Sequence, residues 1–268
     1  MNASVCFVSS GPGAADLITL RGLQRLSQAA VVLADALADP ALRAFAPQAN
    51  WIDVGKRGFA HGVRQSEINA LLLQQAHEAT GLVVRLKGGD ASVFGRLEEE
   101  LEVLHEAGIA TEVVPGVTAA LAAAAHAQRP LTRRGLGRRV TLATAMTREG
   151  ASGVTPNGAT ADTEVFYMAG RQLPGLQQRL LAAGWAPDTP ALVVSRAGCA
   201  DALTSEHRLD RLADATLLHG GRPTVVTVGV GARAICTAPL TKVKSDTQAN
   251  PEPHLELAVL SGPTPKSS

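Results

Sequence analysis

A run of apolar residues that ends in two glycines and an aspartate constrains the fold of this chain more than any other stretch. Residues 82–86 predict a buried strand, and the Gly-Gly-Asp of residues 88–90 predicts a tight loop. Leucines at positions 97, 101 and 104 then share one face of a helix expected from about residue 94 to 107. A strand, a glycine loop and a helix in this order are typical of ligand sites in open α/β sheets, because glycine lets a bound molecule approach the backbone. Taken alone, the motif is equally typical of a turn and helix cap.

Predicted strands and helices alternate along the rest of the chain. Short apolar runs predict strands at residues 5–8, 31–33, 51–54, 112–114, 140–145, 165–168, 191–194 and 224–230. Helical patterns lie between most of them, including an alanine-rich one at residues 119–127 and another at residues 209–218. This alternation favours an α/β fold built on a mostly parallel sheet.

An arginine-rich stretch at residues 129–139 divides the chain. Its five arginines are typical either of a solvated connection or of a grip on carboxylates or phosphates. We therefore expect an N-terminal α/β domain over residues 1–128 and a C-terminal α/β domain over residues 129–237. Residues 149–163 are rich in Gly, Ser, Thr, Pro and Asn and predict a mobile loop, whereas residues 238–268 predict a disordered or loosely docked tail.

The composition is that of a globular protein without a general affinity for polyanions or membranes. Of the 268 residues, 46% are hydrophobic and 18% charged, and the formal net charge is +1, so any polyanion site is local. The first residues lack the basic segment of a secretion signal, and no apolar run approaches the roughly 18 residues of a membrane span. Three distant cysteines, Cys6, Cys199 and Cys236, indicate neither a disulfide framework nor a zinc site. We expect a cytoplasmic protein that binds no nucleic acid, membrane or metal.

The first glycine-rich turn leaves one alternative open. Gly11-Pro12-Gly13 follows a predicted strand, and Asp35 closes the next strand about 20 residues later, as in dinucleotide-binding folds. The turn lacks the Gly-x-Gly-x-x-Gly spacing, however, and Pro12 fixes φ and removes a backbone donor from the loop. A nicotinamide cofactor is therefore the weaker interpretation of this turn.

The motifs, in their order and spacing, resemble those of the tetrapyrrole methylase family. The resemblance runs from about residue 5 to residue 230, and an ordered series of motifs is far more specific than one glycine-rich loop. The matching segments are Gly11-Pro12-Gly13 with Asp16-Leu17 and Thr19-Leu20, Val54-Gly55-Lys56-Arg57, Gln65 with Glu67-Ile68-Asn69, Arg85-Leu86-Lys87-Gly88-Gly89-Asp90 with Val93-Phe94-Gly95-Arg96, Val113-Val114-Pro115-Gly116-Val117-Thr118-Ala119, Pro130-Leu131-Thr132, Phe166-Tyr167-Met168, and Pro223-Thr224.

Membership of that family implies a fold, a reaction and a set of site residues. The fold is two α/β domains with S-adenosylmethionine in the cleft between them, usually as a homodimer. Within the family, the motifs are most like those of the members that transfer methyl groups to carbons 2 and 7 of uroporphyrinogen III, which gives precorrin-2 for sirohaem or cobalamin, and this resemblance implies the same reaction. The family's acid and base positions fall on Asp35 and Lys56, and its substrate-side arginine and glutamate on Arg96 and Glu99. Its cofactor contacts fall on Pro12, Gly88, Gly89, Asp90, Val93, Thr118, Ala119, Met168, Ala197 and Thr224.

The chemistry of these residue types agrees with such a reaction. Methyl transfer is an in-line displacement at a sulfonium carbon, so catalysis depends mainly on positioning. A base must later remove a proton from the methylated pyrrole, and Asp35, Lys56 or Arg96 could assist. Uroporphyrinogen carries eight carboxylates, for which Lys56, Arg57, Arg96 and the arginine-rich stretch are candidate partners.

The sequence departs from the family pattern at three places on the substrate side. Tyr-Asp-Arg-Leu becomes Ala34-Asp35-Ala36-Leu37, Gly-Gly-Glu-Glu after Arg96 becomes Leu97-Glu98-Glu99-Glu100, and Thr-Gly-His becomes Thr144-Ala145-Met146. The first change removes an expected arginine and puts the substrate in question. Two alternatives therefore stay open. One is a sister methylase of a later corrin intermediate such as precorrin-4, whose methyltransferases residues 97–101 and 122–125 also resemble. The other is a catalytically weakened protein that binds S-adenosylmethionine as a sensor or partner subunit.

Overall fold

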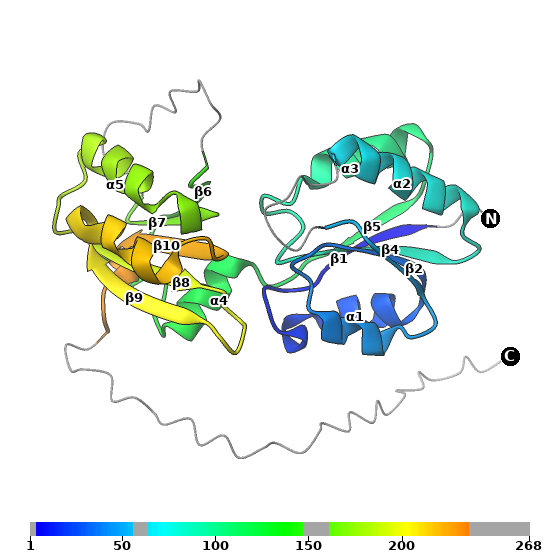
Figure 1. The fold of residues 1–268 in the computed structure, drawn as a ribbon, viewed down its shortest axis with the longest axis horizontal. Helices are drawn as coiled ribbons and strands as arrows, with labels where there is room; N and C mark the ends of the chain where they lie inside the picture. Colours follow the sequence, from blue (N-terminus) through cyan, green and yellow to red (C-terminus); the bar gives the residue numbers. More distant parts are fainter. Residues whose placement is uncertain (1–3, 56–63, 147–160, 236–268) are drawn as a thin grey trace, which may run out of the picture. The chain divides into compact units, whose positions relative to one another are not determined.

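The computed structural model describes residues 4–55, 64–146 and 161–235. They form two five-stranded sheets, and helices pack against both faces of each sheet (Figure 1). The predicted α/β class is confirmed.

The first sheet is parallel throughout. Its strand order is β3-β2-β4-β1-β5. The strands are β1 (Val5–Ser9), β2 (Ala29–Ala34), β3 (Asn50–Asp53), β4 (Leu82–Lys87) and β5 (Thr111–Val114). β1 is buried along its whole length and β4 along nearly all of it, which is why they read as apolar runs rather than as alternating patterns. Because β4 and β5 both pair with β1, the loops that follow these three strands begin at one edge of the sheet.

Helices cover both faces of the first sheet. On one face Leu26 of α1 (Leu20–Ser27) and Leu42 of the 3₁₀ helix η2 (Pro40–Phe45) pack against Val8. On the other face Leu72 of α2 (Gln65–Glu78) and Leu104 of α3 (Leu97–Glu106) pack against β1 and β4. A short 3₁₀ helix, η1 (Ala15–Leu17), precedes α1, whose first turn is capped by the side chain of the residue before it.

The second sheet is mixed, so the expectation of a mostly parallel sheet is wrong for this half of the chain. Its order is β6-β7-β10-β8-β9, in which only β6 and β7 pair in parallel. The strands are β6 (Val140–Thr144), β7 (Thr163–Tyr167), β8 (Pro190–Ser195), β9 (Leu203–Arg208) and β10 (Thr224–Gly229). The apolar patterns missed β9 because its residues alternate between half-buried and exposed, as in an edge strand. The seven residues between β8 and β9 are also too few for a parallel crossover.

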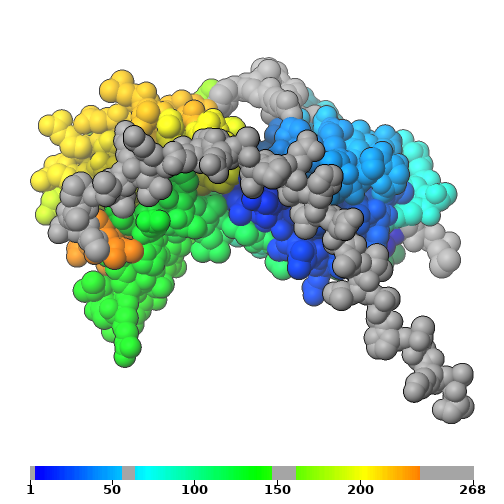
Figure 2. Space-filling model, turned by 90° about the horizontal axis from the view of Figure 1, so that it is seen from below, coloured from blue at the N-terminus to red at the C-terminus, as the bar shows by residue number. Residues whose placement is uncertain are grey.

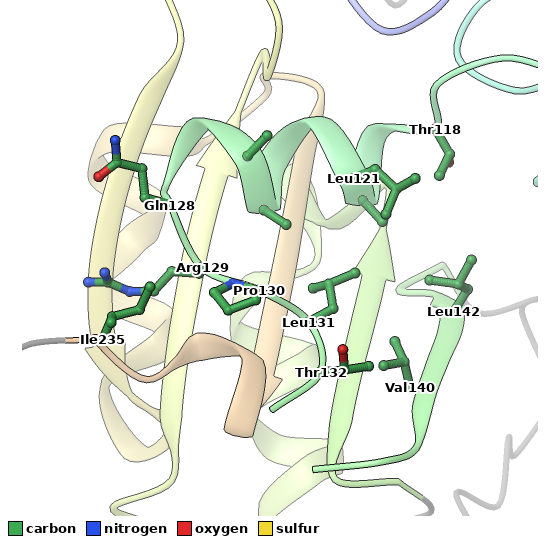
Figure 3. A pocket seen from close by; sticks show the side chains of 13 residues that line it. Thr118, Leu121, Gln128, Arg129, Pro130, Leu131, Thr132, Val140, Leu142 and Ile235 are labelled. Atoms are coloured by element: carbon green, nitrogen blue, oxygen red, sulfur yellow. The ribbon is translucent and has the colours of Figure 1, made fainter. Parts of the chain in front are cut away.

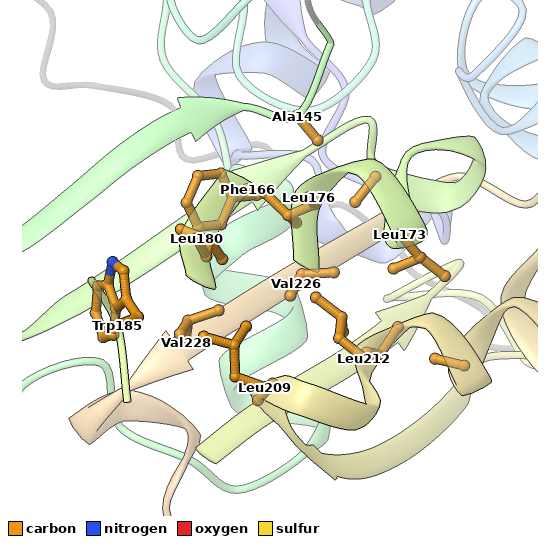
Figure 4. Close-up of a cluster of buried hydrophobic side chains, with 14 of the residues drawn as sticks. Ala145, Phe166, Leu173, Leu176, Leu180, Trp185, Leu209, Leu212, Val226 and Val228 are labelled. Carbon is orange, nitrogen blue, oxygen red and sulfur yellow. The ribbon is translucent and has the colours of Figure 1, made fainter. Parts of the chain in front are cut away.

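Helices cover both faces of the second sheet, and α5 (Leu173–Ala182) lies on the first of these faces. Leu176 and Leu180 of α5 pack with Phe166 and Val226 of the sheet (Figure 4). The same face carries η4 (Leu209–Ala215) and α6 (Thr216–His219), where a single helix over residues 209–218 was expected. Two further 3₁₀ helices are η3 (Ala169–Arg171) and η5 (Val230–Ala232).

The opposite face is covered by α4 (Ala119–His126), whose alanines allow the helix to lie close to the strands. α4 precedes the expected domain limit at residue 129 but packs against the second sheet. The domain limits 1–128 and 129–237 therefore stay a prediction. The expected tail over residues 238–268 and residues 149–160 of the expected mobile loop lie outside the described residues.

Within the described ranges, no helix is both long and apolar enough to cross a membrane. The same ranges contain no group of three or more His, Cys, Asp or Glu side chains that could hold a metal ion.

Candidate functional site

The glycine loops after β1 and β4 meet because the two strands are neighbours in the first sheet. Gly11 and Gly89 exchange two backbone hydrogen bonds, with N to O distances of 3.1 and 2.9 Å. Both have positive φ, +75° and +69°, a conformation that favours glycine. A Cβ on Gly11 would come within 2.7 Å of the Leu17 carbonyl oxygen, whereas a Cβ on Gly89 would meet nothing within 4 Å. Gly89 therefore presents bare backbone to open space, as a ligand loop requires.

Asp90 ties this loop to the loop after β5. Its Oδ2 accepts from the Gly116 N–H at 2.8 Å, and its Oδ1 accepts from the Ser92 N–H at 2.9 Å and from the Ser92 hydroxyl. Burial alone would raise the pKa of Asp90, but the hydrogen bonds from Gly116 and Ser92 outweigh it and hold the pKa below its usual value. The carboxylate is therefore ionised and fixes two loops of the sheet edge together.

A cavity of about 1060 Å³ lies beside these loops. Its walls come from the loops after β1, β2 and β4 and from residues near the ends of β7, β8 and β10, so both sheets contribute to one site. The volume suits a ligand of cofactor size. All ten positions predicted to contact the cofactor line this cavity, namely Pro12, Gly88, Gly89, Asp90, Val93, Thr118, Ala119, Met168, Ala197 and Thr224.

The backbone is strained at four places around the cavity. Phe94, Arg96, Met168 and Arg196 line it and have φ between +52° and +56°, a region that residues with a Cβ rarely adopt. The Phe94 ring meets the Tyr167 ring edge-on, with centroids 5.0 Å apart. Such strain persists where the surrounding structure enforces it, and it is concentrated at functional sites.

A buried charge cluster forms part of the cavity wall. Arg85 of β4 and Glu100 of α3, 2% and 0% exposed, pair through Nε and Oε2 at 3.2 Å and through Nη2 and Oε1 at 3.3 Å. Lys87 Nζ lies 2.8 Å from Glu100 Oε1, and Arg85 Nη2 lies 2.6 Å from Asp35 Oδ1. Burial and the neighbouring Arg85 charge lower the pKa of Lys87. Glu100 thus compensates two buried cations, and Arg85 fixes the Asp35 carboxylate at the cavity.

Sequence reasoning did not assign a role to Arg85, Lys87 or Glu100. A signal was present, because two charged residues interrupt the otherwise apolar strand β4, and buried charges are rare unless they are paired. The partner Glu100 is one of three consecutive glutamates, Glu98 to Glu100. Only the packing of α3, which turns Glu100 toward the sheet, distinguishes this glutamate from its two neighbours.

The four predicted catalytic and substrate-side residues have different surroundings. Asp35 and Arg96 line the cavity. Glu99 does not line it but forms a two-pronged ion pair with Arg96, at 2.7 and 2.6 Å, and both side chains are about half exposed. The hydrogen bonds from Arg96 lower the pKa of Glu99. Lys56 lies outside the described residues.

Comparison with known proteins identifies the family. The family described as Tetrapyrrole (Corrin/Porphyrin) Methylases matches residues 4–213 of the chain. The chain belongs to the tetrapyrrole methylases. Its fold is also that of solved tetrapyrrole methylases.

The sequence of this tetrapyrrole methylase is similar to those of several named proteins. It is 37% identical over 246 residues to the uroporphyrinogen-III C-methyltransferase of Pseudomonas aeruginosa, covering 90% of this chain and 99% of that protein. It is 46% identical over 192 residues to the siroheme synthase of Edwardsiella ictaluri, covering 71% of this chain and 41% of that protein. The chain thus spans less than half the length of the siroheme synthases it matches.

Two solved structures are similar. The uroporphyrin-III C-methyl transferase of Thermus thermophilus, complexed with S-adenosyl homocysteine, has a TM-score of 0.74 at 35% identity, covering 85% of this chain and 97% of that chain. A cobalt precorrin-4 methyltransferase has a TM-score of 0.76 at 29% identity, covering 86% and 96%.

Among the described residues that differ from the family pattern, only Ala36 lines the cavity. The Ala36 backbone nitrogen would lie within 2.0 Å of a Cβ on Gly55, so the approach of the two backbones requires glycine at position 55. Leu97 packs against the core of the first sheet, and Ala145 is fully buried in the core of the second. The missing arginine at position 36 is therefore the departure that bears on the substrate.

Proposed function

We propose that this tetrapyrrole methylase is an S-adenosylmethionine-dependent C-methyltransferase that methylates uroporphyrinogen III at carbons 2 and 7 to give precorrin-2, in sirohaem or cobalamin biosynthesis. The observation that carries the proposal is the convergence of all ten predicted cofactor positions, with Asp35 and Arg96, on one cavity. The names of the Pseudomonas and Thermus relatives support the same substrate and cofactor.

The residues present fit S-adenosylmethionine. Gly89 offers bare backbone, and Val93, Ala119 and Met168 give the cavity an apolar wall. A carboxylate has about four acceptor positions, and Asp90 uses three of them within the protein, so one remains for a hydroxyl or ammonium donor. When bound, S-adenosylmethionine supplies the methyl group on a sulfonium carbon.

In this proposal the protein acts mainly by positioning and by moving one proton. Asp35 Oδ1 is held by Arg85, while its Oδ2 receives no hydrogen bond from the described residues and is free to accept the pyrrole proton. The fixed orientation of the carboxylate avoids reorganisation during the reaction. Arg85 and Lys87, compensated by Glu100, keep the wall charged without leaving a buried ion unpaired.

Arg96 is the proposed contact for the substrate's carboxylates. It lines the cavity with its side chain more than half exposed, and its planar guanidinium fork matches a carboxylate. Glu99 occupies that fork here. The substrate must therefore displace Glu99 or bind the remaining donors of Arg96.

An anaerobic assay with S-adenosylmethionine and uroporphyrinogen III tests the proposal. A product heavier by two methyl groups, with the absorbance of precorrin-2, is expected. If cobalt precorrin-4 is methylated instead, the substrate assignment is wrong; the high TM-score to the precorrin-4 enzyme and the absent arginine at Ala36 favour this second candidate. Binding of S-adenosylhomocysteine without any product would leave a cofactor-binding protein. A melting temperature raised by NADH rather than by S-adenosylhomocysteine would point to a nicotinamide protein.

We further propose that the protein works as a cytoplasmic homodimer. A second cavity of about 850 Å³ is lined by α4, residues 128–132, Val140 and Leu142 of β6, and Ile235. Figure 3 shows Leu121, Leu131, Val140 and Leu142 along this groove, and in Figure 2 the same stretch belongs to the green surface. Three of its apolar side chains are 42% to 61% exposed, which suits burial by a second copy. The two cysteines in the described ranges are free thiols, in agreement with a reducing compartment.

A further inference from the structure

Two serines and a buried histidine are hydrogen-bonded in a line across the second sheet, apart from the walls of the cavity. Ser195 ends β8 and Ser205 lies on β9; because Ser195 pairs with Leu203 and Val193 pairs with Ser205, both hydroxyls point to one face. His219, the last residue of α6, is fully buried over that face. Its Nδ1 lies 2.9 Å from Ser195 Oγ and its Nε2 lies 2.8 Å from Ser205 Oγ.

One arrangement of protons satisfies the hydrogen bonds along this line. Arg222 Nε donates to Ser195 Oγ at 3.1 Å, and among the described residues the Ser195 hydroxyl has no acceptor other than His219 Nδ1, so this arrangement places the Ser195 proton toward Nδ1. His219 is then neutral with its proton on Nε2, which donates to Ser205. The Ser205 hydroxyl in turn donates to His207 Nε2 at 2.7 Å. In this arrangement each donor from Arg222 Nε to the Ser205 hydroxyl meets an acceptor, and the line ends at the outer edge strand.

At its other end the line reaches the cavity. Arg222 Nη2 donates to the Asp201 carbonyl oxygen and to Asp201 Oδ2 at 3.1 Å. Asp201 Oδ1 accepts from Arg196 Nε at 2.7 Å. Arg196 and Asp201 line the cavity, and Arg196 has the left-handed φ of +52°. These hydrogen bonds therefore hold the loop of residues 196–202 at its first residue, Arg196, and near its end, at Asp201.

That loop has little freedom to move without disturbing the site. The Gly198 carbonyl accepts from the Ala14 N–H at 3.0 Å, and a Cβ on Gly198 would come within 2.0 Å of the Pro12 carbonyl oxygen. Pro12 and Ala197 are both proposed cofactor contacts in the cavity. A shift of a few tenths of an ångström in this loop would thus change both sides of the cofactor site.

We propose that His219 is a positioning residue for the cofactor cavity: its neutral ring orients Ser195, which holds Arg222, which fixes the loop of residues 196–202. The inference rests on the proposed function for the identity of the ligand. It adds to that function a residue that touches neither cofactor nor substrate.

Two matched serine variants of the 268-residue chain test this inference. Ser195→Ala and Ser205→Ala each remove one hydrogen bond to His219, but only Ser195 connects it to Arg222. Ser195→Ala is expected to raise the Kd for S-adenosylhomocysteine about tenfold by titration calorimetry, as for a lost hydrogen bond to a charged group, whereas Ser205→Ala leaves it within about twofold. Both should lower the melting temperature similarly. Equal affinities in the two variants would overturn the inference.

A histidine pair gives a second, independent comparison. His219→Asn keeps an acceptor where Nδ1 lies, and His219→Gln keeps a donor near Nε2 but no acceptor for Ser195. The expected affinity of the Asn variant is near that of wild type, and that of the Gln variant is reduced like Ser195→Ala. The reverse order would contradict the proton positions given above.

Hydrogen exchange of the ligand-free protein separates this inference from the proposed function. Faster exchange at residues 196–202 in Ser195→Ala but not in Ser205→Ala is the expected result. Unchanged exchange there would refute the positioning role whether or not S-adenosylhomocysteine binds. Failure of the wild-type protein to bind S-adenosylhomocysteine would instead refute the proposed cofactor.

Discussion

Single carboxylates at this site have different tasks that depend on their surroundings. Glu99 and Glu100 are adjacent in the sequence, but Glu99 is partly exposed and pairs with Arg96, whereas Glu100 is fully buried between two cations. Asp90 joins two loops, and Asp35 is oriented by Arg85 toward the cavity. Three predictions follow from these contacts.

Glu100→Gln should destabilise the protein by about 3 kcal/mol, because removing one partner leaves Arg85 and Lys87 as incompletely compensated buried charges. Urea denaturation measures the free energy of unfolding. Glu99→Gln is the matched control, since its partly exposed ion pair contributes far less to stability than a buried one. Equal losses of unfolding free energy in the two variants would show that the burial of Glu100 does not increase the contribution of its ion pairs to stability.

Asp90→Ala should weaken S-adenosylhomocysteine binding about tenfold or more, because it removes a charged acceptor and releases the Gly116 loop. Asp162→Ala is a suitable control. Asp162 also accepts two backbone N–H groups, from Arg138 and Arg139 at 2.9 Å, but it does not line the cavity. Unchanged affinity of the Asp90 variant in calorimetry would remove Asp90 from the cofactor site.

Arg96→Ala should lower kcat/KM for uroporphyrinogen III about tenfold or more while S-adenosylhomocysteine binds as in wild type, since a bond between charged groups contributes roughly 1.5–3 kcal/mol. Arg208→Ala removes a similar exposed pair, with Asp210 at 3.1 and 3.0 Å, outside the cavity, and should leave turnover unchanged. Near-normal turnover of the Arg96 variant would exclude Arg96 from substrate binding.

At the scale of secondary-structure elements, the second half of the site depends on how the edge of its sheet is built. β9 is held to β8 by backbone pairing and to α6 by the Ser205–His219 hydrogen bond. The loop between β8 and β9 carries Ala197 into the cavity. The short terminal helix is therefore part of the support of the cofactor site through Ser195 and Arg222, and the edge strand beside it is too polar to be found by its pattern.

The burial of His219 makes the packing of α6 on this sheet sensitive to pH. Burial, helped by the nearby His207 and Arg222, lowers the pKa of His219 from 6.5 to about 4. Burial also lowers the pKa of His207, and the negative charge of Asp214 opposes that shift. Below pH 6.5 the unfolded chain binds a proton at His219 that the folded protein excludes. The free energy of unfolding should therefore be about 2 kcal/mol smaller at pH 5 than at pH 7.5 through this residue alone.

Urea denaturation at the two pH values measures this difference. His219→Asn removes the titrating group and should reduce the pH dependence by about that amount. A pH dependence identical to that of wild type would show that folding does not lower the pKa of His219.

At the scale of the whole molecule, the groove beside α4 predicts self-association. Leu121, 54% exposed on α4, is the substitution site of choice, because a charge there would be buried by a second copy. Leu121→Asp should shift the sedimentation of the protein from dimer to monomer, whereas Leu217→Asp, at an equally apolar position that is 96% exposed on α6, should not. A wild-type monomer would refute the proposed homodimer.

The sequence by itself determined the parallel first sheet, its glycine loops and the family. These depend on local signals: buried parallel strands read as apolar runs, and glycines mark the positions where positive φ or close approach is required. Only the tertiary structure decided which glutamate meets Arg85 and Lys87, where the polar strand β9 pairs, and that His219 connects to the cavity through Ser195 and Arg222. The side-chain hydrogen bonds among these contacts join residues 13 to 27 positions apart, and such pairings follow from the packing of whole elements rather than from any pattern within one of them.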